Sequence, residues 1–449
     1  MKNQLIAGAL LSIWSLTGCD EFLDAKPQQS LVIPNTLNDF QALLDAEPRY
    51  MNMVGNLALL GSDEMVLGPN VLTRINPEEK AMYFWEKEIY TQSDMVNEWR
   101  TIYSMIYYAN LVIDGVEDFE PRDEVERLRA NELKGAAMFS RALGHFSLMQ
   151  VFAAPYDPEQ TSLPGIPLRT TADINLQTSL SSTAEVYALI LEDLEFARTH
   201  MQDKAEMVTR ASKWSAEALL SRVFMTMQEY EKVVKHAGIA LSIGNELMDF
   251  NTLPVGGTYT FPRFNPEVIH HARLLNNRMT FNAEQFVHPD LYALYDSLDL
   301  RKTVLFDSAR TEGYVNLVSR YTGDYFDFGG LAVDEVLLDH AEASLRIGNE
   351  KEALEDLNEL LRHRYVSGEF TELNLSGEPL MRRILEERRK ELLFRGIRWL
   401  DLRRLNQDPA YAVTLDRSYN GSEAVLLPEG DGYTVSIPPN EYTLNPNLD

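Results

Sequence analysis

The only cysteine of this 449-residue chain, Cys19, lies near the N-terminus and directly after an apolar run. A single thiol can form no disulfide within the chain, and a metal site would need several soft ligands. A catalytic thiol would also need a neighbouring base and a pocket, which a chain end does not readily supply. The flanks favour another chemistry, because the chain begins with a basic MKN, residues 5–16 are largely apolar, and the LTGC sequence ending at Cys19 has the pattern of a bacterial lipobox. We therefore expect residues 1–18 to be a signal peptide that is removed and Cys19 to carry a lipid anchor.

Sequence motifs for hydrolysis, phosphoryl transfer and redox chemistry are absent. The chain contains no HExxH, no GxSxG, no P-loop and no dinucleotide fingerprint. His270 and His271 are adjacent, so their rings would point apart on a helix or strand and could not chelate one metal together. We expect this pair on the surface or in a loop. The sequence therefore predicts no catalytic residue, no metal and no cofactor.

Aromatic and polar side chains outside the helical repeats are the candidates for ligand binding, because sugars and peptides are often held on aromatic faces. Trp85 is our preferred stacking platform, whereas Trp99 is favoured as a core residue because it lies four residues before Tyr103 on one helix face. Each aromatic residue taken singly is more often part of the core. The candidate ligand-binding residues are Trp85, Tyr90, Asn97, Tyr321, Tyr325 and Phe326.

The composition limits the kinds of partner. Hydrophobic residues make up 45% of the chain, which is enough for a large core. The formal net charge is −27, with 68 acidic against 41 basic residues, so the phosphates of nucleic acids and of anionic lipids would be repelled. We therefore expect no nucleic-acid partner, and we expect the lipid rather than surface charge to hold the protein at a membrane.

Helical periodicity dominates the chain. Residues 212–243 and 334–365 each show two amphipathic helices separated by a polar break, with small residues where the helices would touch. A unit of roughly 34 residues built from two antiparallel helices is the tetratricopeptide plan. Weaker helix pairs are expected near residues 95–151 and 182–200. The predicted fold is mainly α, an α-superhelix of about four tetratricopeptide-like pairs.

Other segments depart from this plan but belong to the same domain, residues 19–449. Residues 251–332 are rich in Pro, Gly and aromatic residues, and we expect a folded, loop-rich insertion with short strands on the ligand side. Helices are expected near residues 95–151, 182–243 and 334–365, a charged helical region at 380–406, and an irregular tail at 407–449. The mixed charges of the region 380–406 favour intramolecular ion pairs over a binding patch.

The stretch RRILEERRKELLFRGIRWLDLRRLN, residues 382–406, resembles the C-terminal signature of the SusD/RagB family. One position departs from the family pattern, because Arg395 stands where the family usually has Glu, which changes the charge available to a local ion pair. Shorter matches occur in order along essentially the whole chain, including the residues after Cys19. The matching signature positions are Glu387, Arg388, Arg389, Glu391, Leu392, Phe394, Gly396, Arg398, Trp399, Asp401, Leu402 and Arg404.

This resemblance implies a non-enzymatic lipoprotein on the outer membrane of a Gram-negative cell. Members are expected to sit over a TonB-dependent transporter of the SusC/RagA kind and to deliver captured nutrients to it. Their ligands are oligosaccharides or peptides, held by variable loops. Three readings stay open for this chain: capture of a glycan, capture of peptides, or an adaptor whose tetratricopeptide groove binds only protein partners.

Overall fold

The structure is a computed structural model that describes residues 34–90, 97–255, 259–275, 283–419 and 421–448. The predicted signal peptide, residues 1–18, and the predicted lipidation site Cys19 lie outside the described residues. Within the described ranges, no helix combines the length and the apolar character needed to cross a bilayer.

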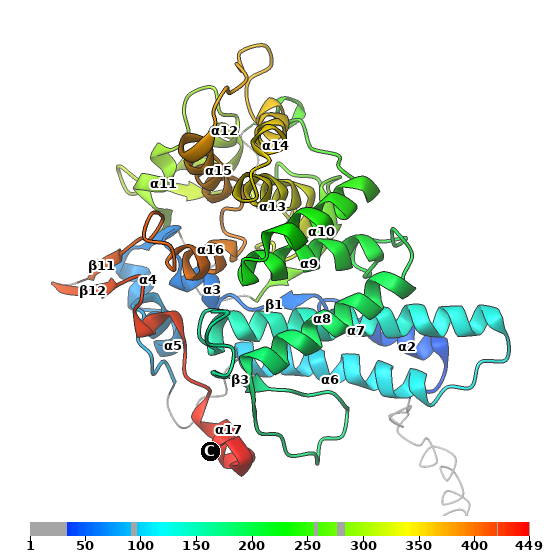
Figure 1. The fold of residues 1–449 in the computed structure, drawn as a ribbon. Helices are drawn as coiled ribbons and strands as arrows, with labels where there is room; N and C mark the ends of the chain where they lie inside the picture. Colours follow the sequence, from blue (N-terminus) through cyan, green and yellow to red (C-terminus); the bar gives the residue numbers. More distant parts are fainter. Residues whose placement is uncertain (1–33, 91–96, 256–258, 276–282, 420, 449) are drawn as a thin grey trace, which may run out of the picture.

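A succession of helices forms the scaffold, and each helix packs against the next one in the chain. Figure 1 shows this stack, with the long cyan and green helices at the bottom and the yellow helices at the top. Small buried residues such as Ala216, Ala237 and Ala341 allow close helix contacts. The mainly α fold predicted from periodicity is therefore confirmed. The stacked helices are α6 (Asn97–Glu117), α7 (Glu124–Phe152), α8 (Thr183–His200), α9 (Lys213–Met227), α10 (Tyr230–Ile243), α13 (Val333–Arg346) and α14 (Glu350–Arg362).

The boundaries of these helices follow local chemistry. Ser182 and Glu185 form a capping box at the start of α8, which satisfies backbone N–H groups that the helix leaves free. The polar break between α9 and α10 is a left-handed residue, Gln228, at φ 59°. Gly348 turns the chain between α13 and α14 at φ 91°, a conformation that glycine adopts without strain.

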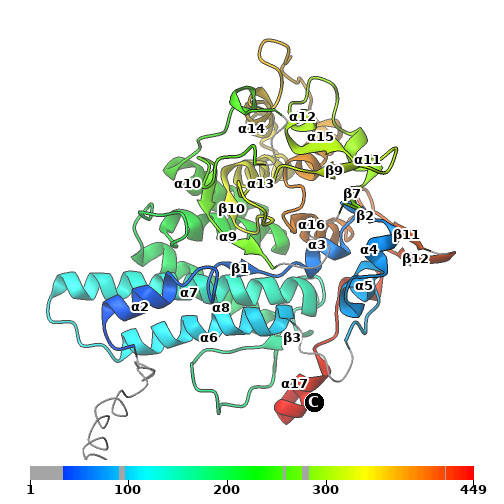
Figure 2. The same ribbon diagram turned by 180° about the vertical axis from the view of Figure 1, so that it is seen from behind.

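Short two-stranded sheets join segments that are far apart in the sequence, as Figure 2 shows from behind. The segment before α6 pairs with the insertion at residues 251–332, and a hairpin lies within the C-terminal tail. The pairs are β1 (Met53–Val54) with β6 (Arg273–Leu274), β2 (Met65–Leu67) with β7 (Gln285–Val287), β3 (Pro164–Pro167) with β4 (Leu180–Ser182), β5 (Val268–His270) with β10 (Leu331–Ala332), β8 (Phe306–Ser308) with β9 (Val315–Leu317), and β11 (Leu415–Tyr419) with β12 (Ser422–Leu426).

The remaining helices complete the described chain, and all of them except α15 are shorter than those of the stack. Several of them precede α6 or belong to the insertion, so they lie around the strands rather than in the helical stack. They are α2 (Leu37–Leu44), α3 (Leu57–Gly61), α4 (Pro69–Leu72), α5 (Pro77–Tyr83), α11 (Pro289–Ala293), α12 (Arg301–Leu305), α15 (Gly377–Glu391), α16 (Ile397–Leu405) and α17 (Pro439–Leu444), with 3-10 turns at Phe250–Thr252, Asp431–Tyr433 and Pro446–Leu448.

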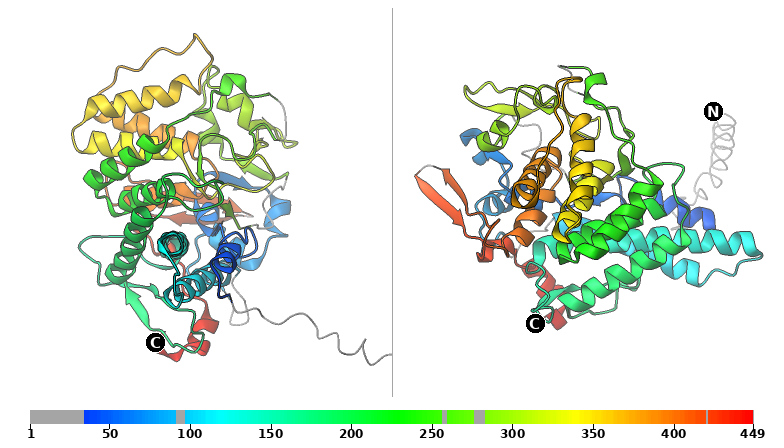
Figure 3. Two further views of the ribbon diagram at one scale, coloured as in Figure 1. Left: turned by 90° about the vertical axis from the view of Figure 1, so that its right-hand side faces the viewer. Right: turned by 45° about the horizontal axis from the view of Figure 1, so that its top comes forward.

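The charged helices α15 and α16 are tied to α13 by buried ion pairs. Figure 3 shows these orange helices beside the yellow ones. Arg388 lies 2.7 Å from Asp339, and Arg404 makes two bonds of 2.6 Å to Glu342. Although burial raises the pKa of Glu342, the Arg404 guanidinium outweighs it and lowers that pKa to about 2. The charges of this region therefore hold the scaffold together, as the mixed sequence predicts.

Arg395, the position that departs from the family pattern, has a complementary partner. Its guanidinium donates to both carboxylate oxygens of Asp334, at 2.9 and 2.7 Å. It also lies over the ring of Tyr321, 3.7 Å from the centroid. A two-bond pair of this kind is geometrically specific, so the arginine replaces the usual acid without leaving an unpaired buried charge.

Two expectations need correction. His270 and His271 are both buried and not at the surface. His270 is the last residue of β5 and contacts Phe139, whereas His271 lies in the connection after β5, so the predicted loop position holds for His271 alone. The tail at 407–449 is not irregular throughout, because it forms the hairpin β11–β12 and the helix α17. The hairpin projects from the body at the left of Figure 1.

Candidate functional site

A cleft of about 360 Å³ opens beside the C-terminal hairpin, and we call it the hairpin cleft. It lies between β2, the start of α11, α15 and β11. Because these elements come from four distant parts of the chain, the cleft exists only in the folded protein. Its charged and polar lining residues are Asp63, His288, Asp290, Arg389, Thr414, Asp416, Arg417 and Ser418.

Asp63 is a fixed negative charge in the lining of the hairpin cleft. Its carboxylate accepts bonds from Arg398 at 2.7 and 3.0 Å and from Arg389 at 2.9 Å. Although burial raises the pKa of Asp63, the charge of Arg398 outweighs it, so the pKa lies well below its usual range. Asp63 is therefore ionised and held in one orientation by two guanidinium groups.

The neighbouring Glu64 has the opposite protonation preference. It is fully buried, accepts a bond of 3.0 Å from the backbone N–H of Phe394, and lies 3.1 Å from the Ser62 hydroxyl. Burial raises its pKa to about 8, so the carboxyl is largely neutral at neutral pH. Since the Ser62 hydroxyl also lies 2.9 Å from the Leu59 carbonyl and can donate there, the protonated carboxyl can donate to the serine oxygen.

The floor of the hairpin cleft is aromatic but covered. Arg417 lies over the rings of Tyr83 and Trp85, at 3.7 and 4.5 Å from their centroids. Its guanidinium donates to backbone carbonyls at the end of α3, including that of Leu60 at 3.0 Å. Burial lowers the pKa of Arg417 to about 10. A cation on these ring faces leaves little apolar surface for a sugar to stack on.

Trp85, the preferred platform, therefore does not offer an exposed ring. Its side chain is 7% exposed, and its indole N–H donates to the Gly61 carbonyl at 2.8 Å. The residue adopts a left-handed backbone at φ 59°, which turns the chain after α5 and directs the ring into the core. Trp85 lines the hairpin cleft, but its ring is not exposed as the stacking platform that the sequence predicts.

Tyr90 and Asn97 flank residues 91–96, which lie outside the described residues. Tyr90 is half-buried, and its hydroxyl forms no hydrogen bond within the described part of the chain. Asn97 is exposed at the first residue of α6, with its side-chain oxygen 3.5 Å from Arg100. Neither residue lines the hairpin cleft. A ligand contact at these two residues stays a prediction.

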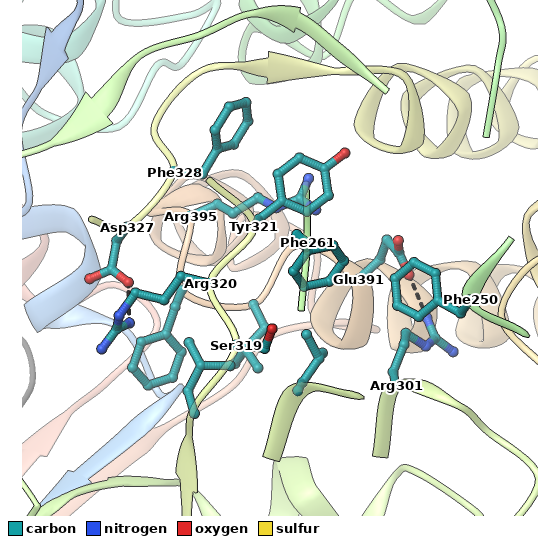
Figure 4. Close-up of a pocket in the computed structure, with 14 residues that line it drawn as sticks. Phe250, Phe261, Arg301, Ser319, Arg320, Tyr321, Asp327, Phe328, Glu391 and Arg395 are labelled. Atoms are coloured by element: carbon teal, nitrogen blue, oxygen red, sulfur yellow. Dashed lines mark hydrogen bonds and ion pairs between the residues drawn. The ribbon is translucent and has the colours of Figure 1, made fainter. Parts of the chain in front are cut away.

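Tyr321 belongs to the interior and not to an exposed site. Its hydroxyl donates to Glu267 at 2.6 Å. Figure 4 shows its ring among Phe261, Phe328 and Arg395 around a cavity of about 30 Å³. A space of this size holds about one or two water molecules, which excludes a sugar ring or a peptide side chain.

Tyr325 and Phe326 form an aromatic pair near this region, in which Tyr325 is exposed and Phe326 is half-buried. Their ring centroids are 4.1 Å apart, and Tyr325 is 49% exposed. Arg273 lies 4.3 Å from the ring centroid of Phe326 and holds that ring in place. This pair retains the surface that a stacking role requires, so its contact with a ligand stays a prediction.

Three buried carboxylates, Glu267, Asp334 and Glu391, lie close enough together to suggest a metal site. However, Arg364 bridges Glu267 and Glu391 at 2.7 Å, and Arg395 holds Asp334. These guanidinium groups already compensate the carboxylate charges. The cluster is therefore a structural ion-pair network rather than a cation site.

Sequence reasoning missed most of the polar lining of the hairpin cleft. The sequence places Arg389 in the charged helical region, and Thr414, Asp416 and Ser418 in the tail that it predicts to be irregular. One signal was present, because Asn-Gly at residues 420–421 separates two short runs, which is a strong hairpin pattern. Nothing in the sequence indicates that this hairpin and His288 line the same cleft.

Comparisons with known proteins agree with this architecture. A family model described as starch-binding and associating with the outer membrane matches residues 21–225, and the SusD family model matches residues 334–448. Two SusD-like proteins of Formosa agariphila are each 25% identical to the chain. The first match covers 51% of this chain and 44% of the relative, so it spans less than half of that protein. The second covers 68% of this chain and 71% of the relative.

Solved structures match nearly the whole chain. A SusD superfamily protein from Bacteroides thetaiotaomicron aligns with a TM-score of 0.75 and 21% identity, over 92% of this chain and 99% of that one. A protein described as a putative sugar binding protein from Bacteroides vulgatus aligns with a TM-score of 0.73 and 21% identity, over 93% and 98% of the two chains. At this level of identity, these likenesses show the fold.

The helical scaffold thus defines a protein of the tetratricopeptide-like class that carries its candidate site on long connecting segments. With the two family models and the SusD-like relatives, the chain belongs to the SusD family.

Proposed function

We propose that this protein captures an oligosaccharide at the cell surface, holds it in the hairpin cleft, and passes it unchanged to a SusC-like TonB-dependent transporter. Family membership supports a nutrient-binding role. Two similar solved structures are described as a sugar binding and a carbohydrate binding protein. The family model's stated association with the outer membrane supports the location.

The observation that carries the proposal is the polar lining of the hairpin cleft. Carboxylates of Asp290 and Asp416 accept hydrogen bonds, the guanidinium of Arg389 donates them, and the hydroxyls of Thr414 and Ser418 do both. Sugar hydroxyls need such a mixture, because each one donates and accepts. The cleft volume of about 360 Å³ lies within the range of small-ligand sites.

Lipid attachment at Cys19 completes the proposed location. Replacing Cys19 with serine removes the thiol that the lipid would join. We expect the C19S protein to leave the membrane fraction, whereas the wild-type protein stays there and copurifies with a TonB-dependent transporter. Retention of C19S in the membrane fraction would contradict lipid anchoring.

Binding is tested on protein lacking residues 1–19, by native gels cast with polysaccharides and by calorimetry against oligosaccharide and peptide pools. Asp416→Ala removes an exposed acceptor from the cleft. We expect it to weaken glycan binding by about tenfold, because a hydrogen bond to a charged group is worth roughly 1.5–3 kcal/mol. Glu423→Ala is the matched control, since Glu423 lies on the partner strand of the same hairpin, is exposed, and does not line the cleft.

The outcomes separate the three readings of the family. Glycan binding that falls with Asp416→Ala and not with Glu423→Ala supports the proposal. Glycan binding that both variants leave intact moves the site elsewhere, with the Tyr325–Phe326 pair as the next candidate. Calorimetric binding to the peptide pool alone favours peptide uptake. No binding to either pool, together with copurification of a membrane protein, favours the adaptor.

A further inference from the structure

A second cavity lies far from the hairpin cleft in the sequence, and we call it the tail groove. It has a volume of about 320 Å³ and lies between α6, the loop at residues 167–178, and the last residues of the chain. Figure 1 shows these segments together at the bottom of the molecule, with α17 in red. Within the described chain, this cavity shares no lining residue with the hairpin cleft.

One wall of the tail groove carries an unsatisfied acceptor. Asn445 is 7% exposed and lines the groove, and its side-chain oxygen receives no hydrogen bond within the described ranges. Its side-chain nitrogen donates to the carbonyl of Thr178 at 2.5 Å. This bond fixes the orientation of the amide, because a flip would place two oxygen atoms together. Buried acceptors are nearly always paired in folded proteins, so this oxygen indicates a ligand that donates.

Opposite charges occupy two different walls of the tail groove. Glu441 comes from α17 and Arg169 from the loop, and each interacts electrostatically with the other. No ion pair joins them among the described residues, whereas Arg169 donates to the Leu176 carbonyl at 2.5 Å. Burial raises the pKa of Glu441, although a hydrogen bond from Trp99 and the charge of Arg169 act against that shift. Two further charged residues line the groove, Arg100 on α6 and Asp173 in the loop. Glu441 and Arg169 therefore present an anion and a cation that do not neutralise each other by contact.

Part of the remaining lining is aromatic and aliphatic, beside polar residues that include Ser104, Asn110 and Thr171. Tyr107 is 36% exposed, and Ile174 on the loop is largely exposed. Tyr103 lines the interior part, where its hydroxyl donates to the Pro167 carbonyl at 2.8 Å. An apolar group of a ligand can lie between these faces, while its polar ends reach Arg169, Glu441 and Asn445.

We propose that the tail groove binds a small zwitterion of the amino-acid class, namely an amino acid or dipeptide with an apolar side chain. The ammonium group donates to Glu441 and to the free oxygen of Asn445, and the carboxylate accepts from Arg169. The apolar side chain lies against Tyr107. This site goes beyond the proposed capture of an oligosaccharide and does not depend on it.

The proposal is tested by calorimetry on the mature chain with leucyl-leucine as the probe. Two blocked forms, the N-acetylated and the C-amidated dipeptide, remove one charge each. We expect leucyl-leucine to bind and each blocked form to bind about tenfold more weakly, because a charge-assisted hydrogen bond is lost. Glu441→Gln and Arg169→Gln should each weaken leucyl-leucine by a similar factor.

Tyr107→Ala keeps the test valid if a groove variant folds poorly, since this ring is partly exposed on α6. It should weaken leucyl-leucine, whereas Tyr325→Ala, an exposed tyrosine away from the groove, should not. Asp416→Ala in the hairpin cleft should also leave dipeptide binding unchanged. The proposal is overturned by no binding up to about 10 mM, by equal binding of the blocked forms, or by loss of binding in Asp416→Ala.

Discussion

Replacing Glu64 with glutamine should make the stability of the protein less dependent on pH. Glu64 is 2% exposed, and burial, reinforced by the charge of Asp63, raises its pKa from 4.5 to about 8. The folded protein therefore keeps a proton on this carboxyl at a pH where the unfolded chain has released it. Glutamine carries no titrating proton, yet its amide can accept from the Phe394 N–H and donate to the Ser62 hydroxyl.

The sign and size of the effect follow from this difference in bound protons. Because the folded state binds more protons between the two pKa values, the free energy of unfolding falls as pH rises through this range. A difference of one bound proton changes the free energy of unfolding by about 1.4 kcal/mol per pH unit. Ionisation of Glu64 therefore lowers the free energy of unfolding by roughly 3–4 kcal/mol between about pH 5 and about pH 8. The free energy of unfolding of Glu64→Gln should equal that of the wild type at the lower pH and exceed it by this amount at the higher pH.

Urea unfolding followed by fluorescence measures this difference at several pH values. Glu352→Gln is the control, since Glu352 is an exposed residue of α14, and its effect should stay within about 0.5 kcal/mol at every pH. A difference between Glu64→Gln and the wild type that stays constant with pH would refute the argument that burial keeps this carboxyl neutral.

Two further variants test buried charge and a buried neutral ring. Arg404→Ala leaves Glu342 buried with weaker compensation, and urea unfolding should show a loss of about 3 kcal/mol, whereas Arg382→Ala at an exposed pair should cost less than about 1 kcal/mol. Equal losses would contradict the structural role of the network. Burial and, secondarily, the charge of Arg141 lower the pKa of His145 to about 3, so this histidine contributes a loss of stability as pH falls below about 6.5, because the unfolded chain takes up a proton. Burial gives His270 and His271 the same direction of effect, and Glu64 gives the opposite one. His145→Leu should remove only the contribution of His145, so the difference in the free energy of unfolding between this variant and the wild type should change between about pH 7 and about pH 5. A difference that stays constant over this range would show that His145 does not contribute.

The helical scaffold was predictable because its signals are local. Residues 212–243 carry both the apolar spacing of α9 and α10 and the polar break at Gln228 that separates them. The mixed charges of residues 380–406 likewise indicated internal ion pairs, and Arg388 makes them with Asp339 and Asp401. Helix periodicity and charge composition act within a few residues of the chain, so a single sequence contains them.

The candidate site was less predictable because its chemistry is assembled over long distances. Trp85 is buried because Arg417, from the C-terminal hairpin, lies on its ring, and no local pattern specifies that contact. The same holds for His270, which reads as a surface histidine until β5 pairs with β10 in the core. Sequence spacing therefore identifies the scaffold, whereas the exposure of an aromatic or polar residue depends on the tertiary contacts that cover it.

The link between scaffold and cleft passes through Asp63. Its carboxylate joins Arg389 of α15 to Arg398 of α16, while the adjacent Glu64 binds the backbone of Phe394 between those helices. A ligand that touches Asp63 or Arg389 therefore meets the same charges that hold α15 and α16 together. Asp416 lies on the hairpin, is exposed, and forms no ion pair among the described residues, so a change there alters the cleft without loosening the scaffold. Loss of binding at Asp63 would mix altered affinity with altered folding, which is why Asp416 is the residue that separates recognition from stability.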